Sequence, residues 1–214
     1  GPGVVRRAGG ALMANAFIAP DGHPRCQWCG GAAEFLPYHD HEWGFPVDDD
    51  QRLFEKLCLE SFQSGLSWRT ILNKRENFRA AFHHFDFNKV AGFDEEDVQR
   101  LLQDAGIIRH RGKIEATINN ARCAQEMVVQ EGSLAAFFWR YEPDSASRPD
   151  PQTQTTSPES IALAKELKKR GWTFFGPTTA FAFMQAMGLI NDHSLNCVTR
   201  ERVEQARQQF HRPT

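Results

Sequence analysis

The chain is organised around the segment Leu59-Glu60-Ser61-Phe62-Gln63-Ser64-Gly65-Leu66-Ser67-Trp68. Leu53 and Leu57, just before this segment, and Glu60 within it follow the i, i+4, i+7 spacing of a helix. Glu60 therefore shares a face with apolar residues. An ionised carboxylate on such a face is costly unless another group pairs with it. The spacing therefore predicts a helix that carries one functional carboxylate toward the core.

The end of this predicted helix is a candidate ligand site. Ser64, Gly65 and Ser67 favour a break in the helix and leave room at its tip, with Trp68 beside the gap. A carboxylate and an indole around a small gap suit a flat ligand that is cationic or carries an amino group. The alternative interpretation is that Glu60 simply reaches solvent at a frayed helix end.

Composition limits the classes of function. The chain has 214 residues, enough for one large domain or one domain with a small satellite, and its net charge is -2. No global field draws it to polyanions, so any contact with nucleic acid must come from a local basic patch. No apolar run of about eighteen residues predicts a membrane span, and no signal peptide is visible. Five cysteines with uneven spacing argue against a disulfide framework and fit a reducing cytoplasm.

Helical periodicity predicts an all-α fold, because no strand alternation of useful length appears. Residues 1–24 are expected to be a tag remnant and a mobile tail, with ordered sequence from Arg25. Residues 25–200 are expected to form the helical domain, and residues 201–214 a C-terminal helix and tail. The block 35–44 is rich in aromatic and metal-capable residues and is expected to be irregular, and the Pro-rich segment 142–156 is expected to be a loop or hinge.

Helix boundaries are indicated by capping residues. The predicted N-caps are Asp49 or Asp50, Ser67, Asp86, Asp94, and Ser157 before Pro158. Gly171 and Gly188 follow predicted helix ends, and the helix from Asp94 is expected to stop at Gly106 in the left-handed position.

Two cysteines and two histidines form a possible tetrahedral zinc set: Cys26, His39, His193 and Cys197. The last two are four residues apart, so on a helical turn both would point the same way. Four protein ligands leave no open position, so such a site would be structural and would join the two ends of the chain. Cys29 and His41 are alternative ligands, and ordinary buried thiols with surface histidines remain the other interpretation.

A cationic turn follows the helix predicted from Asp94. A helix, a glycine-containing hairpin and a second helix N-terminus within about residues 94–122 would present free amide groups to a phosphate, and nearby cations would add charge. This is the pattern of a helix-hairpin-helix element, which grips the DNA backbone without reading sequence. Its candidate DNA contacts are Gly106, Ile108, Arg109, Arg111, Gly112 and Lys113. The alternative is a short inter-helix turn with solvated cations.

Aromatic residues cluster on both sides of Glu60 in the sequence: Trp28, Tyr38, Trp43 and Trp68. Flat rings stack on nucleobases, and a carboxylate accepts hydrogen bonds from an exocyclic amine. The alternative is that these rings belong to an ordinary core.

The chain resembles the bacterial type I 3-methyladenine DNA glycosylases of the helix-hairpin-helix superfamily. The resemblance rests on six motifs in order: Arg25-Cys26-x-Trp28, Tyr38-His39-Asp40-x-Glu42-Trp43-Gly44, Leu59 to Trp68 as quoted, Lys74-Arg75-Glu76-Asn77-Phe78, Asp104-Ala105-Gly106-Ile107-Ile108-Arg109, and Gly188-Leu189-x-Asn191-Asp192-His193. These span the chain from Cys26 to about Cys197.

The resemblance implies base-excision repair by hydrolysis of the N-glycosidic bond of 3-methyladenine. The partners would be double-stranded DNA and the free base, and the enzyme a cytoplasmic monomer. It implies zinc ligands at Cys26, His39, His193 and Cys197 rather than at the alternatives. It implies a catalytic, base-reading carboxylate at Glu60 with a pocket formed by Tyr38, Trp68, Trp28, Trp43 and Phe35, the last a tyrosine in some relatives.

The same resemblance leaves one role without a residue. Most of the superfamily uses an aspartate after the hairpin, which this type lacks, and Glu131 lies in that region without a role assigned to it. Two rival classes are a zinc-stapled DNA-binding module without catalysis and a metallohydrolase, the latter disfavoured because a catalytic zinc needs an open position.

Overall fold

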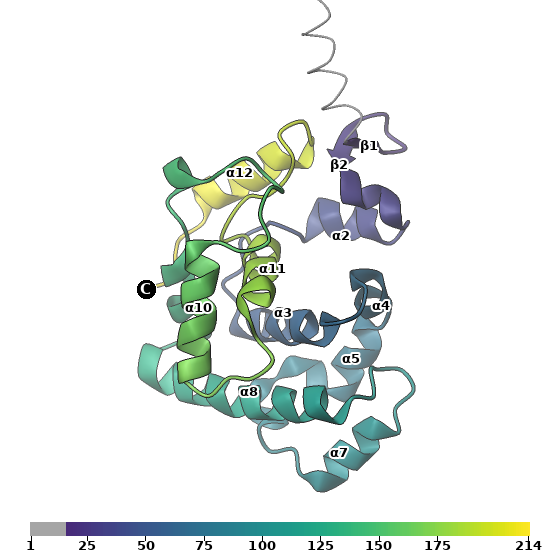
Figure 1. Cartoon of the computed structure of the whole chain (residues 1–214), viewed down its shortest axis with the longest axis vertical. Coiled ribbons are helices and arrows are strands. Elements are labelled where there is room, and N and C mark those ends of the chain that lie inside the picture. The colour runs from purple at the N-terminus through teal and green to yellow at the C-terminus, as the bar shows by residue number, and fades with distance from the viewer. Residues whose placement is uncertain (1–15) are drawn as a thin grey trace, which may run out of the picture.

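The computed structural model describes residues 16–214, and helices dominate it (Figure 1). The α-helices are α2 (Phe35–His41), α3 (Asp50–Gln63), α4 (Trp68–Asn73), α5 (Arg75–Ala81), α6 (Phe87–Val90), α7 (Glu95–Leu102), α8 (Arg111–Glu131), α9 (Leu134–Phe138), α10 (Pro158–Lys169), α11 (Pro177–Met187) and α12 (Thr199–Gln209). Short 3₁₀ helices are η1 (Gln27–Gly31), η2 (His83–Phe85), η3 (Trp139–Tyr141) and η4 (Ser145–Ser147). The prediction of a predominantly helical fold is confirmed.

The core lies around α3 and α11, which pack against each other near the centre of the molecule (Figure 1). Helix α10 packs on α11, and the long α8 contacts α3 and α6 on the side away from α12. Phenylalanines fill much of the interior, and several of them have almost no exposed surface: Phe54, Phe62, Phe78, Phe82, Phe137, Phe138 and Phe183. Burial of such rings supplies a large part of the apolar area removed from water.

Side-chain caps fix most of the predicted helix starts. Asp49, Ser67, Asp86, Asp94 and Ser157 each accept a hydrogen bond from a backbone amide of the first helical turn. Gly188 ends α11 in the left-handed region at φ +81°, where a Cβ would lie 2.6 Å from the backbone of Phe45 and Pro46. A side chain at this position is therefore excluded twice, by backbone conformation and by space.

Gly106 has a different role from the one predicted. Helix α7 already ends at Leu102, and Gly106 lies outside the left-handed region. A Cβ there would lie 3.0 Å from the side chains of Asn77 and Asp104, so this glycine permits close packing of the turn against the α5 segment.

The N-terminal segment holds structure that periodicity did not reveal. Strands β1 (Ala16–Ile18) and β2 (Pro24–Cys26) pair antiparallel, with Phe17 opposite Arg25, so the prediction that ordered structure begins at Arg25 is wrong. Gly22, at φ +82°, makes the turn between them. Residues 1–15, including the predicted tag remnant, lie outside the described residues.

Two further local predictions are wrong. The block 35–44, expected to be irregular, contains α2, whose ring packing against the core compensates for the lack of a side-chain cap. His193 and Cys197 are not on a helix, because α12 begins only at Thr199. None of the helices within residues 16–214 combines the length and apolar character that crossing a membrane requires.

Candidate functional site

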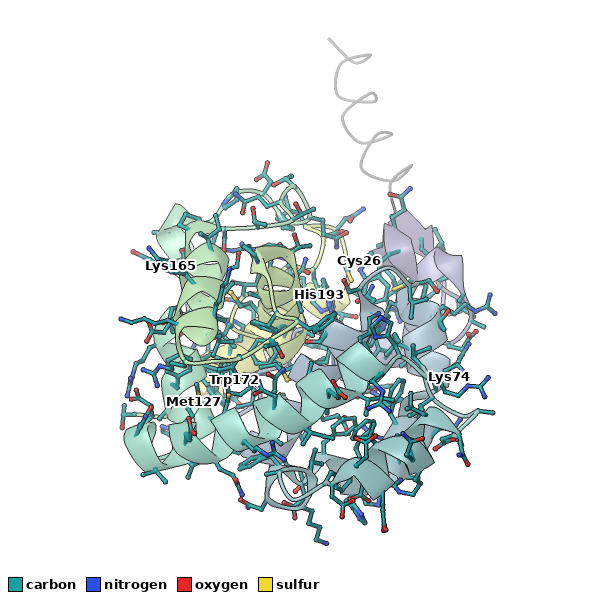
Figure 2. All side chains as sticks on the ribbon, turned by 60° about the horizontal axis from the view of Figure 1, so that its bottom comes forward. Cys26, Lys74, Met127, Lys165, Trp172 and His193 are labelled. Atoms are coloured by element: carbon teal, nitrogen blue, oxygen red, sulfur yellow. The ribbon has the colours of Figure 1, made fainter. Side chains whose placement is uncertain are left out.

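The four predicted metal ligands meet in the structure. Cys26 lies at the end of β2, His39 is on α2, and His193 and Cys197 lie between α11 and α12. Their donor atoms all lie within 4.8 Å of one another, and all four residues are buried. Cys26 and His193 lie near each other in Figure 2 although 167 residues separate them. The alternative ligands Cys29 and His41 are not part of this cluster.

Hydrogen bonds to the ring nitrogens that point away from the thiols orient both imidazole rings. The Nδ1 of His39 lies 2.8 Å from Asp40 Oδ1, and the Nε2 of His193 lies 2.8 Å from the carbonyl oxygen of Trp43. Each ring therefore turns its other nitrogen toward the two thiols. A carboxylate or carbonyl on the outer nitrogen is the usual arrangement around a metal-bound histidine.

The two thiols differ in their electrostatic environment. Hydrogen bonds from Cys26, His193 and His39 lower the pKa of Cys197 far below its usual range. The pKa of Cys26 is raised by the hydrogen bond with Cys197 and by burial. The amide of Ser194 donates to the Cys26 sulfur at 3.3 Å, which acts in the opposite direction. Two sulfurs and two imidazole nitrogens at this spacing form a donor set that could hold a metal ion.

A cavity of about 390 Å³ opens beside this cluster. All six residues of the predicted base pocket line it: Trp28, Phe35, Tyr38, Trp43, Glu60 and Trp68. The structure adds residues that the sequence did not indicate, namely Gln63, Gln152, Gln154, Ala182 and Gln185. Gln152 and Gln154 belong to the segment 142–156, so the predicted loop forms part of the cavity wall.

Ring contacts connect the cavity to the cluster of Cys26, His39, His193 and Cys197. The ring centroids of Tyr38 and Trp68 lie 5.4 Å apart, and those of Trp28 and Trp43 lie 5.2 Å apart in a T-shaped pair. Trp43 continues to His193, at 4.8 Å between centroids. The cluster therefore holds one wall of the cavity through direct packing.

Glu60 is buried, with 7% of its surface exposed, so the interpretation of a solvated carboxylate is wrong. Its partner is Lys56, one turn earlier on α3, whose Nζ lies 3.0 Å from Glu60 Oε1. Lys56 also donates a hydrogen bond to the Tyr38 hydroxyl. Burial lowers the pKa of Lys56 and raises that of Tyr38, which the charge of Glu60 raises further. The sequence analysis predicts Glu60 on the apolar face but does not name Lys56 as its partner.

The predicted DNA-contact turn lies between α7 and α8. Arg109 and Arg111 are exposed, and Arg111 forms ion pairs of 3.0 Å with Glu95 and Glu115. The Gly106 amide donates to Asp104 Oδ1 at 2.8 Å, so it is not free. The part of the turn open to a ligand is therefore narrower than predicted.

Lys113 is not a surface cation. It is 8% exposed, and its Nζ donates to the carbonyl oxygens of Phe62 and Ser64 at 2.9 and 2.6 Å. The prediction that Lys113 binds DNA is therefore wrong, because its ammonium group satisfies the last carbonyls of α3 instead. This contact ties α8 to the tip of the helix that carries Glu60.

Glu131 offers no free carboxylate for chemistry. Its oxygens lie 2.8 Å from Arg170 and 2.7 Å from Arg140, and these hydrogen bonds, the one from Arg170 first, lower its pKa. The residue links α8 to its neighbours at the surface.

Comparison with known proteins identifies the family. Residues 28–201 match the family model described as methyladenine glycosylase. The chain belongs to the methyladenine glycosylase family. It is 49% identical over 177 residues to the DNA-3-methyladenine glycosylase 1 of Escherichia coli (strain K12), which covers 81% of this chain and 95% of that protein. A Haemophilus influenzae DNA-3-methyladenine glycosylase is 46% identical over 177 residues, which cover 81% of this chain and 96% of that protein.

Solved structures of the family have the same fold. A crystal structure of a 3-methyladenine DNA glycosylase I superposes with a TM-score of 0.74 at 49% identity, covering 81% of this chain and 98% of that one. A Staphylococcus aureus glycosylase, solved to explain 3-methyladenine recognition, gives a TM-score of 0.73 at 36% identity, over 79% of this chain and 92% of that one.

Proposed function

We propose that this protein is a DNA-3-methyladenine glycosylase that hydrolyses the N-glycosidic bond of 3-methyladenine in alkylated DNA. It releases the free base and leaves an abasic site. The observation that carries the proposal is the cavity beside the Cys/His cluster, where a buried carboxylate, Glu60, lies among aromatic rings. This combination of stacking surfaces and a buried carboxylate acceptor suits a purine flipped out of the DNA.

The chemistry of the substrate explains why one carboxylate is sufficient. Methylation at N3 makes the base cationic while it is attached to the sugar, so it leaves as a neutral molecule and needs little help from a general acid. Glu60 would accept a hydrogen bond from the amino edge of the base, and Tyr38 and Trp68 would stack on it. Water then attacks the sugar from the side opposite the departing base. Selection of the base, rather than acid catalysis, is the main task of the site.

Phe35 distinguishes this pocket from those relatives that carry a tyrosine there. Its ring lines the cavity and packs edge-on against Trp28 at 5.7 Å between centroids. A phenylalanine supplies a surface for packing but no hydroxyl, so recognition by hydrogen bonding falls to the other groups of the pocket.

Cys26, His39, His193 and Cys197 would hold one structural zinc ion. Two thiolates and two imidazoles fill a tetrahedral coordination sphere, so bound zinc would supply cross-linking rather than Lewis-acid chemistry. The contact of Trp43 with His193 supports this role, because it connects the ligand set to the wall of the base pocket.

The turn between α7 and α8 would act as a helix-hairpin-helix grip on a DNA phosphate. Arg109 and Arg111 are the exposed cations at the turn, and the amides of Ile108 and Gly112 make no hydrogen bond among residues 16–214. Such contacts position DNA without reading its sequence. With Lys113 bound to α3, the proposed phosphate contacts are those four residues.

The setting of the proposed activity is double-stranded DNA in the bacterial cytoplasm, with the protein acting as a monomer. None of the five cysteines forms a disulfide, which fits a reducing compartment.

The test is a glycosylase assay on methylated DNA, with the released base identified by chromatography. The proposal predicts enzyme-dependent release of 3-methyladenine in preference to other methylated purines. If the protein bound this DNA but released no base, it would be a damage-binding module without catalysis.

A further inference from the structure

Lys56 lies behind the proposed base pocket and contacts three of its residues without lining the cavity itself. Its Nζ lies 3.0 Å from Glu60 Oε1 and 3.5 Å from the ring centroid of Trp68. The same ammonium group donates to the hydroxyl of Tyr38. One buried cation therefore joins the carboxylate of α3 to rings supplied by α2 and α4.

The neighbouring charges leave Glu60 as the anion that compensates Lys56. Lys56 is only 5% exposed, and a buried ammonium group is costly unless its charge is paired. The other charged groups nearby form two pairs of their own, Glu42 with Arg75 and Glu55 with Arg79, each at 2.7 Å. Those carboxylates already have guanidinium partners, whereas within residues 16–214 Glu60 forms its ion pair with Lys56.

The pairing also divides the two oxygens of the carboxylate. Oε1 is the oxygen of Glu60 that lies closest to Lys56 Nζ, at 3.0 Å, and Oε2 takes part in none of the side-chain hydrogen bonds found within residues 16–214. Glu60 lines the cavity, so Oε2 is the oxygen available to a ligand. A carboxylate held at one oxygen loses rotamer freedom before the ligand arrives, which reduces the entropic cost of binding.

We propose that Lys56 is a positioning residue for base recognition. It holds Glu60 with one oxygen turned to the lysine and the other free for the amino edge of the base. Its charge also offsets that of Glu60, so the pocket selects its ligand by a directed hydrogen bond and stacking rather than by net negative charge. The inference rests on the proposed role of Glu60 and adds the group that orients it.

A double-mutant cycle on Lys56 and Glu60 tests this positioning role. The proteins are the wild type, K56M, E60Q, the double variant K56M/E60Q, and K56R. Methionine has a similar length and can fill the same apolar space, whereas arginine keeps the charge. The measurements are the single-turnover rate of 3-methyladenine release from methylated DNA and the Kd for free 3-methyladenine. Each is made below the unfolding transition of the variant.

The expected result is that K56M slows release and weakens binding by about tenfold or more, as loss of orientation at a site does. In the E60Q background the same substitution should change either quantity by less than about twofold, because the lysine acts through the carboxylate. K56R should recover part of the loss seen in K56M.

Equal losses from K56M in the wild-type and E60Q backgrounds would overturn the inference, because they would show that Lys56 contributes only packing. Wild-type activity in K56M would overturn it as well. In both cases the wild-type protein still releases 3-methyladenine, so the proposed function stands. A wild-type protein that releases no base would overturn the function and the inference together.

Discussion

Replacement of Glu60 by glutamine should cost stability as well as recognition, because it leaves the buried ammonium group of Lys56 without its anion. The two groups lie 3.0 Å apart and are 5% and 7% exposed. Breaking a buried ion pair of this kind costs about 3–5 kcal/mol. The lysine can avoid being buried as a cation by losing its proton. For a lysine of ordinary pKa 10.5, deprotonation at pH 7.5 takes about 4 kcal/mol, so the cost cannot exceed this value. We therefore expect E60Q to lose about 3–4 kcal/mol of unfolding free energy at pH 7.5.

The sign of the pH dependence follows from the same pair. In E60Q the folded state disfavours the charged lysine, so it binds fewer protons than the unfolded state, and its stability rises with pH toward the unfolded pKa. At pH 9.5, one unit below the ordinary lysine pKa of 10.5, deprotonating the lysine takes only about 1.4 kcal/mol. The stability that E60Q loses relative to the wild type is then no larger than this. Urea unfolding of the wild type and E60Q at both pH values measures the difference.

The control is the K56M/E60Q double variant, which removes both charges and should recover most of the lost stability at pH 7.5. Unfolding of E60Q at the same urea concentration as the wild type at pH 7.5 would contradict a buried, unpaired lysine. A stability deficit of E60Q that stays constant between pH 7.5 and pH 9.5 would contradict it as well.

Three further predictions concern the metal, the DNA and the fold. Metal analysis of the purified protein should find one zinc per chain, and C197S should lose metal and stability together. Cys29 is a buried thiol outside the cluster, so C29S should keep both. A metal-free C197S of wild-type stability would contradict this. R109A should weaken DNA binding, reduce the slope of log affinity against log salt by about 1 and leave the Kd for free 3-methyladenine unchanged. An unchanged salt slope would remove this arginine from the phosphate contacts. G188A should destabilise the protein by about 2 kcal/mol or more, because a Cβ at this position would lie 2.6 Å from backbone atoms. Gly176 has open space around it, so G176A should be nearly neutral. Equal effects of the two substitutions would contradict the role of close packing at Gly188.

The parts of the fold that could be predicted are those governed by local chemistry. Asp49, Ser67 and Asp94 lie directly before apolar helical patterns, and each caps its helix as expected. Ser157 before Pro158 and Gly188 after α11 likewise mark boundaries through backbone preferences. These signals act within one turn of helix and do not depend on the rest of the chain.

The parts that could not be predicted depend on tertiary packing. Helix α2 lacks a side-chain cap, and its stability comes from rings that pack on other elements. His193 and Cys197 come together on a non-helical turn, so their spacing of four indicated the wrong local structure although both residues join the cluster. β1 is only three residues long, too short to give a periodic pattern.

The positions of two lysines are the part of the site that the sequence predicts least well. Lys56 and Lys113 would both be expected at the surface, yet both are buried and fully engaged. For Lys56 one signal was present: it lies four residues before Glu60 on the same helix face, where a buried carboxylate needs a cation. For Lys113 the partners are backbone carbonyls of a distant helix, which no local pattern reveals.

The most direct test of the role of Glu60 is equilibrium binding of free 3-methyladenine to the wild type and E60Q, measured by calorimetry under conditions where unfolding curves show both proteins folded. If Glu60 accepts a hydrogen bond from the base, E60Q should bind it at least about tenfold more weakly, the loss expected for one hydrogen bond to a charged group. Equal affinity of the two proteins would contradict that role and remove Glu60 from base recognition.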